Sequence, residues 1–203
     1  MKKIFSFLMV TFIIACNMNT SNSESNSDTP LSASDSIYTI ETEESQIVWT
    51  GRELSTSSHY GTLDFKSGEF EVSDGLIVNG EFEVDMTSLN NQDMDGGSKE
   101  RLENHLKSDD FFSVDKFPSA HLYISSSEIV SEGKWSVVGF LTIKDKSHPL
   151  TFEMTNTSNG WTANLVFDRS LYDVRFRSGT FFENLGDKLI LDEIELAINL
   201  KII

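Results

Sequence analysis

The stretch GLIVNGEFEVDMT, residues 75–87, alternates apolar and polar side chains with a period of two. The acidic residues share one face with Ile77, and Gly80 interrupts an apolar face made of Leu76, Val78, Phe82, Val84 and Met86. Successive side chains of a β-strand point to opposite sides of a sheet, so this pattern predicts a strand with one buried and one solvated face.

The same alternation recurs along most of the chain. Gly, Asn and Ser separate further candidate strands at residues 46–53, 60–72, 120–129, 135–144, 149–156, 161–168 and 190–201. About eight strands with one apolar and one acidic face predict an all-β domain, either a sandwich or a closed antiparallel barrel. Closure into a barrel removes the exposed edges through which sheets aggregate.

One segment has a helical pattern, at residues 99–107. Leu102 and Leu106 share a face, and Glu103 and Lys107 form a favourable pair four residues apart. Ser98 stands where a serine hydroxyl can cap the first turn. We therefore expect one short helix in an otherwise β-rich domain.

The N-terminus resembles that of a bacterial lipoprotein. A basic start precedes the apolar run Ile4–Ala15, which is shorter than the roughly 20 residues of a membrane span and fits a signal peptide. Ile13-Ile14-Ala15-Cys16 resembles a lipobox, which implies cleavage before Cys16 and attachment of diacylglycerol to its sulfur. The alternative is an N-terminal core helix with a buried thiol, but the Ser- and Asn-rich residues that follow offer little to pack against it.

This pattern predicts a division into a signal peptide (1–15), a lipidated Cys16 with a flexible tether (16–37) and one domain (38–203). The expected location is the cell envelope, at the outer membrane or the periplasmic face. The expected membrane contact is the lipid on Cys16. The sequence leaves open whether the domain forms a homodimer.

Composition argues against several functional classes. The chain has 32 Asp and Glu but only 16 Lys and Arg, a net charge of −16, which does not suit nucleic-acid binding. A single cysteine cannot form an intramolecular disulfide or supply a thiolate metal site. The four histidines form no metal-binding pair, and the chain has no nucleophile elbow or phosphate-binding glycine loop. We expect no enzyme, metal or cofactor.

Three of the five arginines, Arg169, Arg175 and Arg177, lie within nine residues and are interleaved with aromatic residues such as Tyr172. One interpretation is that they bind an anionic or carbonyl-bearing head group. The other is that they hold a long loop over the end of a barrel by pairing with Asp168, Asp173 or Asp187.

The apolar strand faces also allow two interpretations. They can fill the interior with packed side chains, or they can line a dry tunnel for a chain-like apolar ligand. The residues that we assign to such a lining are Trp49, Val78, Phe82, Val84, Phe140, Phe152, Leu165, Phe167, Ile194 and Ile198.

Several stretches, in this order, together resemble the YceI-like family of bacterial lipid-binding proteins. They span most of residues 40–203 and read VWTG (48–51), HYGTLDFKSGE (59–69), GEFEVDMTSL (80–89), LENHLKSDDFF (102–112), KFP (116–118), GFLTIK (139–144), DR (168–169) and SGTFFENLGDK (178–188). The resemblance implies a lipocalin-like, eight-stranded antiparallel barrel that holds a long polyisoprenoid tail and has no catalytic residues.

The arginine loop departs from the family pattern at one position. The family usually has Gly after the aromatic residue, whereas this chain has Tyr172-Asp173. Aspartate tolerates a left-handed backbone better than most residues, so the turn can be kept. The resemblance also implies head-group contacts for Tyr172 and Arg175.

The sequence thus predicts non-catalytic binding or carriage of a long-chain isoprenoid, of the quinone or polyprenyl phosphate type, in the cell envelope. The alternative is a packed barrel that acts as an envelope scaffold or stress-response partner without a lipid. A third and less favoured function is an enzyme acting on a bound lipid, which requires polar residues such as His59, Asp110 or Arg169 to converge in the cavity.

Overall fold

A computed structural model describes residues 35–55 and 57–203. The signal peptide, Cys16 and most of the tether lie outside the described residues. The strands are β1 (Ser36–Thr39), β2 (Gln46–Arg52), β3 (Ser58–Ser73), β4 (Leu76–Asn91), β5 (Ser119–Ser131), β6 (Lys134–Ile143), β7 (Lys146–Thr157), β8 (Gly160–Asp168) and β9 (Glu193–Leu200). The helices are α1 (Gly96–Lys107) and the short 3-10 turns η1 (Arg169–Tyr172) and η2 (Gly186–Lys188).

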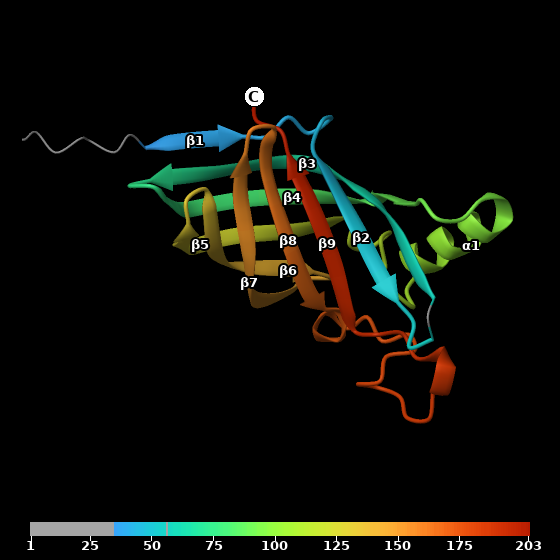
Figure 1. The fold of residues 1–203 in the computed structure, drawn as a ribbon. Coiled ribbons are helices and arrows are strands. Elements are labelled where there is room, and N and C mark those ends of the chain that lie inside the picture. Colours follow the sequence, from blue (N-terminus) through green and yellow to red (C-terminus); the bar gives the residue numbers. More distant parts are fainter. Residues whose placement is uncertain (1–34, 56) are drawn as a thin grey trace, which may run out of the picture. The chain divides into compact units, whose positions relative to one another are not determined.

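Strands β2 to β9 form a closed antiparallel barrel (Figure 1). Each strand pairs with the next one in the chain, and β9 pairs with β2 to close the barrel, with Gln46 opposite Asn199. The all-β, lipocalin-like barrel is therefore confirmed, and a sandwich is not. Within the described residues, no helix is both long and apolar enough to cross a membrane.

Two strands, β2 and β1, pair with different parts of the same edge of strand β3. Its first residues, from Ser58 to Leu63, pair with β2, and its later residues, from Glu69 to Val72, pair with β1. β1 thus joins the barrel beside the β3–β4 turn, at the end opposite to α1 (Figure 1). We call these two ends the β1 end and the α1 end.

A β-bulge in β3 changes which residues face the interior. Lys66 has no partner on β4, while the residues on either side of it are paired. Before the bulge Leu63 and Phe65 point inward, and after it Gly68 and Phe70 do so. One extra residue therefore shifts the buried positions from odd to even numbers.

A second bulge, in β4, changes which residues of 75–87 face the interior. Ile77 and Asn79 pair with adjacent residues of β3, so Val78 is the extra residue. Ile77 is completely buried, whereas Val78 exposes 37% of its surface. The alternation predicted for Val78 fails because a bulge reverses the phase of the strand at that point.

Helix α1 begins earlier than the sequence predicts. Its first residue is Gly96, and Asp95 occupies the N-cap position without a side-chain capping bond. The predicted capping role of Ser98 is wrong because that residue already lies inside the first turn.

The predicted pair between Glu103 and Lys107 is also absent from the ion pairs of the described residues. The Glu103 carboxylate lies 3.8 Å from the Lys99 ammonium and accepts a hydrogen bond of 2.8 Å from the backbone N–H of Asn91. The Lys107 ammonium donates to the Thr87 carbonyl at 2.9 Å. Both side chains turn toward β4 because α1 packs against the end of that strand.

Candidate ligand-binding cavity

A cavity of about 240 Å³ lies inside the α1 end of the barrel. Its wall consists of inward side chains from seven strands, mainly Ile47, Trp49, Leu63, Val84, Met86, Leu89, Ala120, Leu141, Ile143, Phe167, Ile194 and Leu196. Its cover comes from α1 and two connecting segments, through Leu102, Leu106, Phe111, Phe112, Phe176 and Ile190. These side chains are apolar, so the cavity suits an apolar ligand.

The cover is held together by an aromatic contact across three segments. The ring of His105 on α1 meets the rings of Phe176 and Phe111 edge-on, with centroids 4.4 and 5.1 Å away. Leu102 and Leu106, which the sequence predicts on one helical face, both border the cavity. The predicted apolar face of α1 thus closes the cavity.

Polar side chains form part of the cavity boundary. Arg52 binds Glu195 with a shortest distance of 2.9 Å, and this carboxylate raises the pKa of Arg52. His59 Nδ1 lies 2.8 Å from an oxygen of Asp93. Arg177 has its guanidinium 5.1 Å from the ring centre of Phe176 and is in no ion pair with the described residues. Arg177 therefore leaves a positive charge at the boundary.

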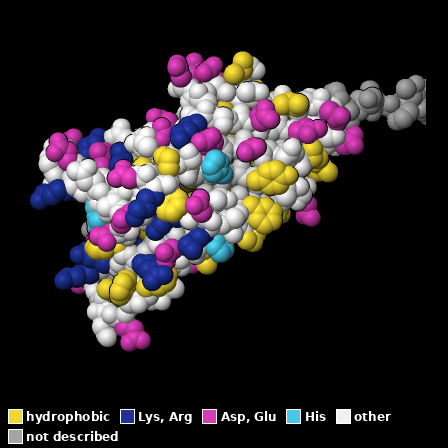
Figure 2. Space-filling model, turned by 180° about the vertical axis from the view of Figure 1, so that it is seen from behind, with side chains coloured by type: hydrophobic (Ala, Val, Ile, Leu, Met, Phe, Trp, Pro, Cys, Tyr) yellow, Lys and Arg dark blue, Asp and Glu magenta, His cyan; other side chains and the backbone are white. Residues whose placement is uncertain are grey.

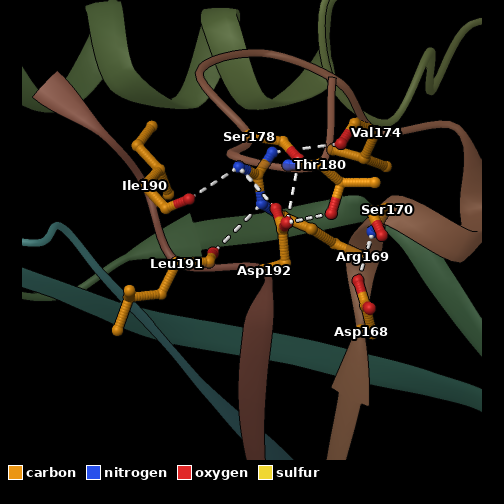
Figure 3. Close-up of polar contacts among 9 residues, drawn as sticks. All are labelled: Asp168, Arg169, Ser170, Val174, Ser178, Thr180, Ile190, Leu191 and Asp192. Carbon is orange, nitrogen blue, oxygen red and sulfur yellow. Dashed lines mark hydrogen bonds and ion pairs between the residues drawn. The ribbon is translucent and has the colours of Figure 1, made fainter. Parts of the chain in front are cut away.

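Arg169 holds residues 173–192, the covering segment, in place over the end of the barrel (Figure 3). Its side chain is completely buried, and its nitrogens donate to three backbone carbonyls at 3.1–3.2 Å, those of Val174, Ile190 and Leu191. It also pairs with Asp192 at 3.2 Å. Burial lowers the pKa of Arg169, and the carboxylate of Asp192 partly offsets this effect.

Asp192 extends the same network to the middle of the covering segment. Its second oxygen accepts hydrogen bonds of 2.9 Å from the hydroxyls of Ser178 and Thr180 (Figure 3). Arg169 and Asp192 thus join both ends and the centre of residues 173–192. The sequence allows the arginine cluster either to bind a head group or to hold a loop over the barrel, and Arg169 has the second role. Its carboxylate partner is Asp192 and not one of the three that the sequence suggests.

The other two predicted head-group residues also lie away from the cavity. Tyr172 is buried behind the wall, with its ring against Phe167 at 5.6 Å, and burial raises its pKa to about 12. Arg175 pairs with Asp173 and borders a neighbouring open depression, which shares Phe176 and Arg177 with the cavity boundary. Asp173 has φ 60° and ψ 33°, so the left-handed turn expected at this position is present.

The predicted lining residues separate into three groups. Four border the cavity: Trp49, Val84, Phe167 and Ile194. Four others are inside the barrel but nearer the β1 end, where they do not border it: Phe82, Phe152, Leu165 and Ile198. The remaining two, Val78 and Phe140, are on the outside.

Phe140 requires a correction because β6 has the opposite phase to the one assumed. Val137, Gly139 and Leu141 point inward, so Phe140 points outward and exposes 41% of its surface. It pairs with Tyr123 on β5, which is also exposed. Both faces of β6 carry apolar residues here, so alternation alone does not identify the inner one.

Trp49 is the wall residue with an unusual polar atom. The side chain is 7% exposed, and its indole nitrogen is buried without a hydrogen-bond partner among the described residues. A buried donor without an acceptor costs about 1–3 kcal/mol. The cavity wall therefore includes a donor that no described group of the protein satisfies.

Sequence reasoning missed most of the cover. Phe111, Phe112 and Phe176 lie in connecting segments, where neither strand nor helix periodicity applies. Only their apolar character inside polar loops could have indicated them. Ile190, which the sequence places at the start of the last strand, precedes β9 instead. Across the described ranges, no group of three or more His, Cys, Asp or Glu side chains is arranged to hold a metal ion.

Known proteins share this architecture. The chain is 25% identical over 132 residues to a UPF0312 protein of Shewanella denitrificans, a match that covers 65% of this chain and 67% of that protein. The crystal structure of Burkholderia cenocepacia BcnA aligns with a TM-score of 0.61 at 19% identity, covering 79% of this chain and 98% of that one.

A domain from Saccharophagus degradans has a similar fold, with a TM-score of 0.53 at 11% identity. It is described as a polyisoprenoid binding domain implicated in plant cell wall breakdown, and the alignment covers 80% of this chain and 95% of that one. The model of the YceI-like domain matches residues 38–202, which include all of the barrel strands β2–β9. The chain therefore belongs to the YceI-like family.

Proposed function

We propose that this protein binds an isoprenoid lipid, without catalysis, and holds its apolar tail inside the barrel. The observation that carries the proposal is the apolar cavity of about 240 Å³ within a closed barrel. The fold shared with a polyisoprenoid binding domain supports the same ligand class. Burial of each methylene-sized group contributes about 0.8 kcal/mol before the cost of ordering the chain, so affinity comes mainly from the tail.

The boundary of the cavity supports a head group with acceptor oxygens. Arg177 offers a guanidinium there, and Trp49 offers an unpaired indole N–H in the wall. Lys and Arg side chains gather toward the α1 end in the view of Figure 2. Quinone carbonyls and polyprenyl phosphate oxygens both accept hydrogen bonds, and a phosphate also gains from the positive charge.

We propose further that the protein works in the cell envelope, attached to a membrane through a lipid on Cys16. The support for this location is the lipobox-like sequence Ile13-Ile14-Ala15-Cys16 after a short apolar run. The barrel then acts as a carrier or store of the isoprenoid at that membrane.

Native mass spectrometry of the full chain purified from its host tests the proposed ligand class. We expect a bound isoprenoid that organic solvent releases. Farnesyl phosphate and a short-tailed ubiquinone, added to delipidated protein, should then change the tryptophan fluorescence.

Two matched variants locate the fluorescence change. Trp49→Phe should lose most of it because Trp49 borders the cavity, whereas Trp135→Phe should keep it because Trp135 does not. Protein that carries no lipid and binds neither probe would contradict the proposal.

A further inference from the structure

The cavity ends part of the way along the barrel. Toward the β1 end it reaches Leu63, Val84 and Leu196 on three different strands. None of the next inward residues on these strands borders the cavity: these are Phe65, Phe82 and Ile198. The interior is therefore neither a continuous tunnel nor completely packed.

Packed aliphatic and aromatic side chains occupy the rest of the interior. The aromatic ones include a connected cluster, the aromatic plug, made of Tyr38, Phe65, Phe70, Phe82, Trp135 and Trp161. The ring centroids of neighbouring members lie 4.9 to 6.4 Å apart, the range of favourable aromatic contacts. One member, Trp135, donates a hydrogen bond of 2.9 Å to the Gly75 carbonyl in the β3–β4 turn.

Phe82 is the member of the plug that lies directly beyond the cavity on β4. Its ring centre is 6.2 Å from that of Phe65 and 6.4 Å from that of Phe70. A Cβ atom at Gly68 would overlap the Phe82 ring, so the lack of a side chain at Gly68 leaves room for this ring. Phe82 is 4% exposed, and its ring packs against Phe65, Gly68 and Phe70 of β3.

The volume in front of the plug limits the length of a tail. A cavity of about 150 Å³ holds one benzene molecule, so a cavity of about 240 Å³ holds roughly ten carbon atoms, or about two isoprene units. A chain of many units does not fit without displacing the aromatic rings. This differs from the long tail that the family resemblance implies.

We infer that Phe82, supported by Phe65 and Gly68, sets an upper limit of about three isoprene units on the tail, one more than the cavity holds because the chain can extend into the mouth. The inference rests on the proposed function and specifies its ligand as a short-chain prenyl lipid. Phe82 is then a specificity-determining residue, because its ring occupies the space that a fourth unit needs.

A series of prenyl monophosphates tests the limit with the full-length wild-type chain. Geranyl, farnesyl, geranylgeranyl and octaprenyl phosphates differ only in tail length. We expect the Kd to fall by up to about tenfold from geranyl to farnesyl, because the third unit is partly buried at the mouth of the cavity. From geranylgeranyl to octaprenyl we expect a change of less than about threefold, because the added units find no further room.

Variants at two phenylalanines separate length from width. Phe82→Ala removes a ring with about the carbon count of one isoprene unit and should tighten geranylgeranyl phosphate by about tenfold relative to farnesyl phosphate. The matched control is Phe167→Ala, which widens the cavity at its side wall and should leave the length limit unchanged. Because loss of a buried ring destabilises the barrel, Phe82→Leu provides a milder second variant with a smaller shift in the same direction.

The outcomes distinguish the two proposals. If no prenyl phosphate and no quinone binds, both the proposed function and the length limit are overturned. If binding occurs but the wild-type affinity keeps rising through octaprenyl phosphate, only the length limit is overturned. If Phe82 and Phe167 variants shift the preference equally, Phe82 has no special role and the inference is also overturned.

Discussion

At the residue scale, Arg169 shows how a residue chosen for chemistry can have a structural role. Cationic residues amid aromatic ones are typical of anion sites, and this pattern made Arg169 a candidate for the ligand. The structure instead surrounds it with three carbonyls and Asp192, all from its own covering segment. A sequence cannot reveal that these acceptors meet the guanidinium, because Ile190, Leu191 and Asp192 lie more than twenty residues further along the chain.

Replacement of Arg169 by methionine should destabilise the protein strongly. The variant leaves the half-buried Asp192 without its cation and three backbone carbonyls without their donor, so we expect a cost toward the roughly 3–5 kcal/mol of breaking a buried ion pair from one side. Urea denaturation should show this loss as a lower midpoint. Arg175→Met is the control: its pair with Asp173 is largely exposed, so a change below about 1 kcal/mol is expected. Equal effects of the two substitutions would contradict the structural role of Arg169.

Ionisation of Asp93, which contacts His59 at the cavity boundary, makes the stability of the fold depend on pH. Burial alone would raise the pKa of Asp93, but hydrogen bonds from His59, the Tyr60 amide and Asn91 outweigh it, so the pKa lies below its ordinary value of 3.8. A carboxyl with a depressed pKa stabilises the fold above the unfolded pKa, and this contribution disappears as the pH falls through the folded pKa.

We therefore expect Asp93→Asn to lower the free energy of unfolding at neutral pH. The difference from the wild type should shrink as the pH falls from about 5 to below the 3.8 of the unfolded carboxyl. Urea midpoints at several pH values measure this. Asp95→Asn serves as the control because Asp95 makes no capping bond. A gap that stays constant down to the lowest pH would show that ionisation of Asp93 does not matter.

At the scale of elements, the alternating pattern predicted every barrel strand and the position of the helix. Its errors in the lining residues all concern which face of a strand points inward. The bulges at Lys66 and Val78 add single residues that reverse the inner and outer faces, and nothing in the local composition marks them. Phe140 was misplaced because both faces of β6 carry apolar residues. Strand existence depends on local periodicity, whereas phase depends on pairing with a neighbour.

Deletion of Lys66 tests whether this residue is the extra one in β3. Without it, Ser67 follows Phe65 directly, the alternation becomes regular, and Gly68 and Phe70 keep the inner face. We therefore expect a folded, soluble protein whose near-UV circular dichroism resembles that of the wild type. Deletion of Glu69 is the contrast, because it turns Phe70 outward and Glu71 inward, places a carboxylate in the core and should abolish soluble protein. If the Lys66 deletion failed to fold while the Glu69 deletion folded, the position of the bulge would be wrong.

At the scale of the whole molecule, the sequence predicted the barrel but only part of the cavity. Trp49, Val84, Phe167 and Ile194 were identified because they lie on regular strands. The cover could not be predicted, since its residues meet only after the connecting segments fold over the barrel. The end of the cavity was equally hidden, because strand phase does not distinguish packed residues from lining ones.

The proposed anchor is tested by Cys16→Ser in the native host. The wild-type protein should fractionate with membranes, require detergent for extraction and carry the mass of an attached lipid. The variant should appear in the soluble fraction. Asn17→Ser, a neighbouring change that keeps the cysteine, should behave like the wild type. A Cys16→Ser protein that stays with the membranes would contradict attachment through this residue.

The entry of β1 beside the β3–β4 turn gives the molecule a polarity. The chain joins the barrel at the pole that the aromatic plug fills, while the cavity lies at the other pole. The proposed anchor would therefore join the barrel at the closed pole and not at the pole that opens into the cavity. In this proposal, the junction with the anchor and the entry of the lipid use different surfaces.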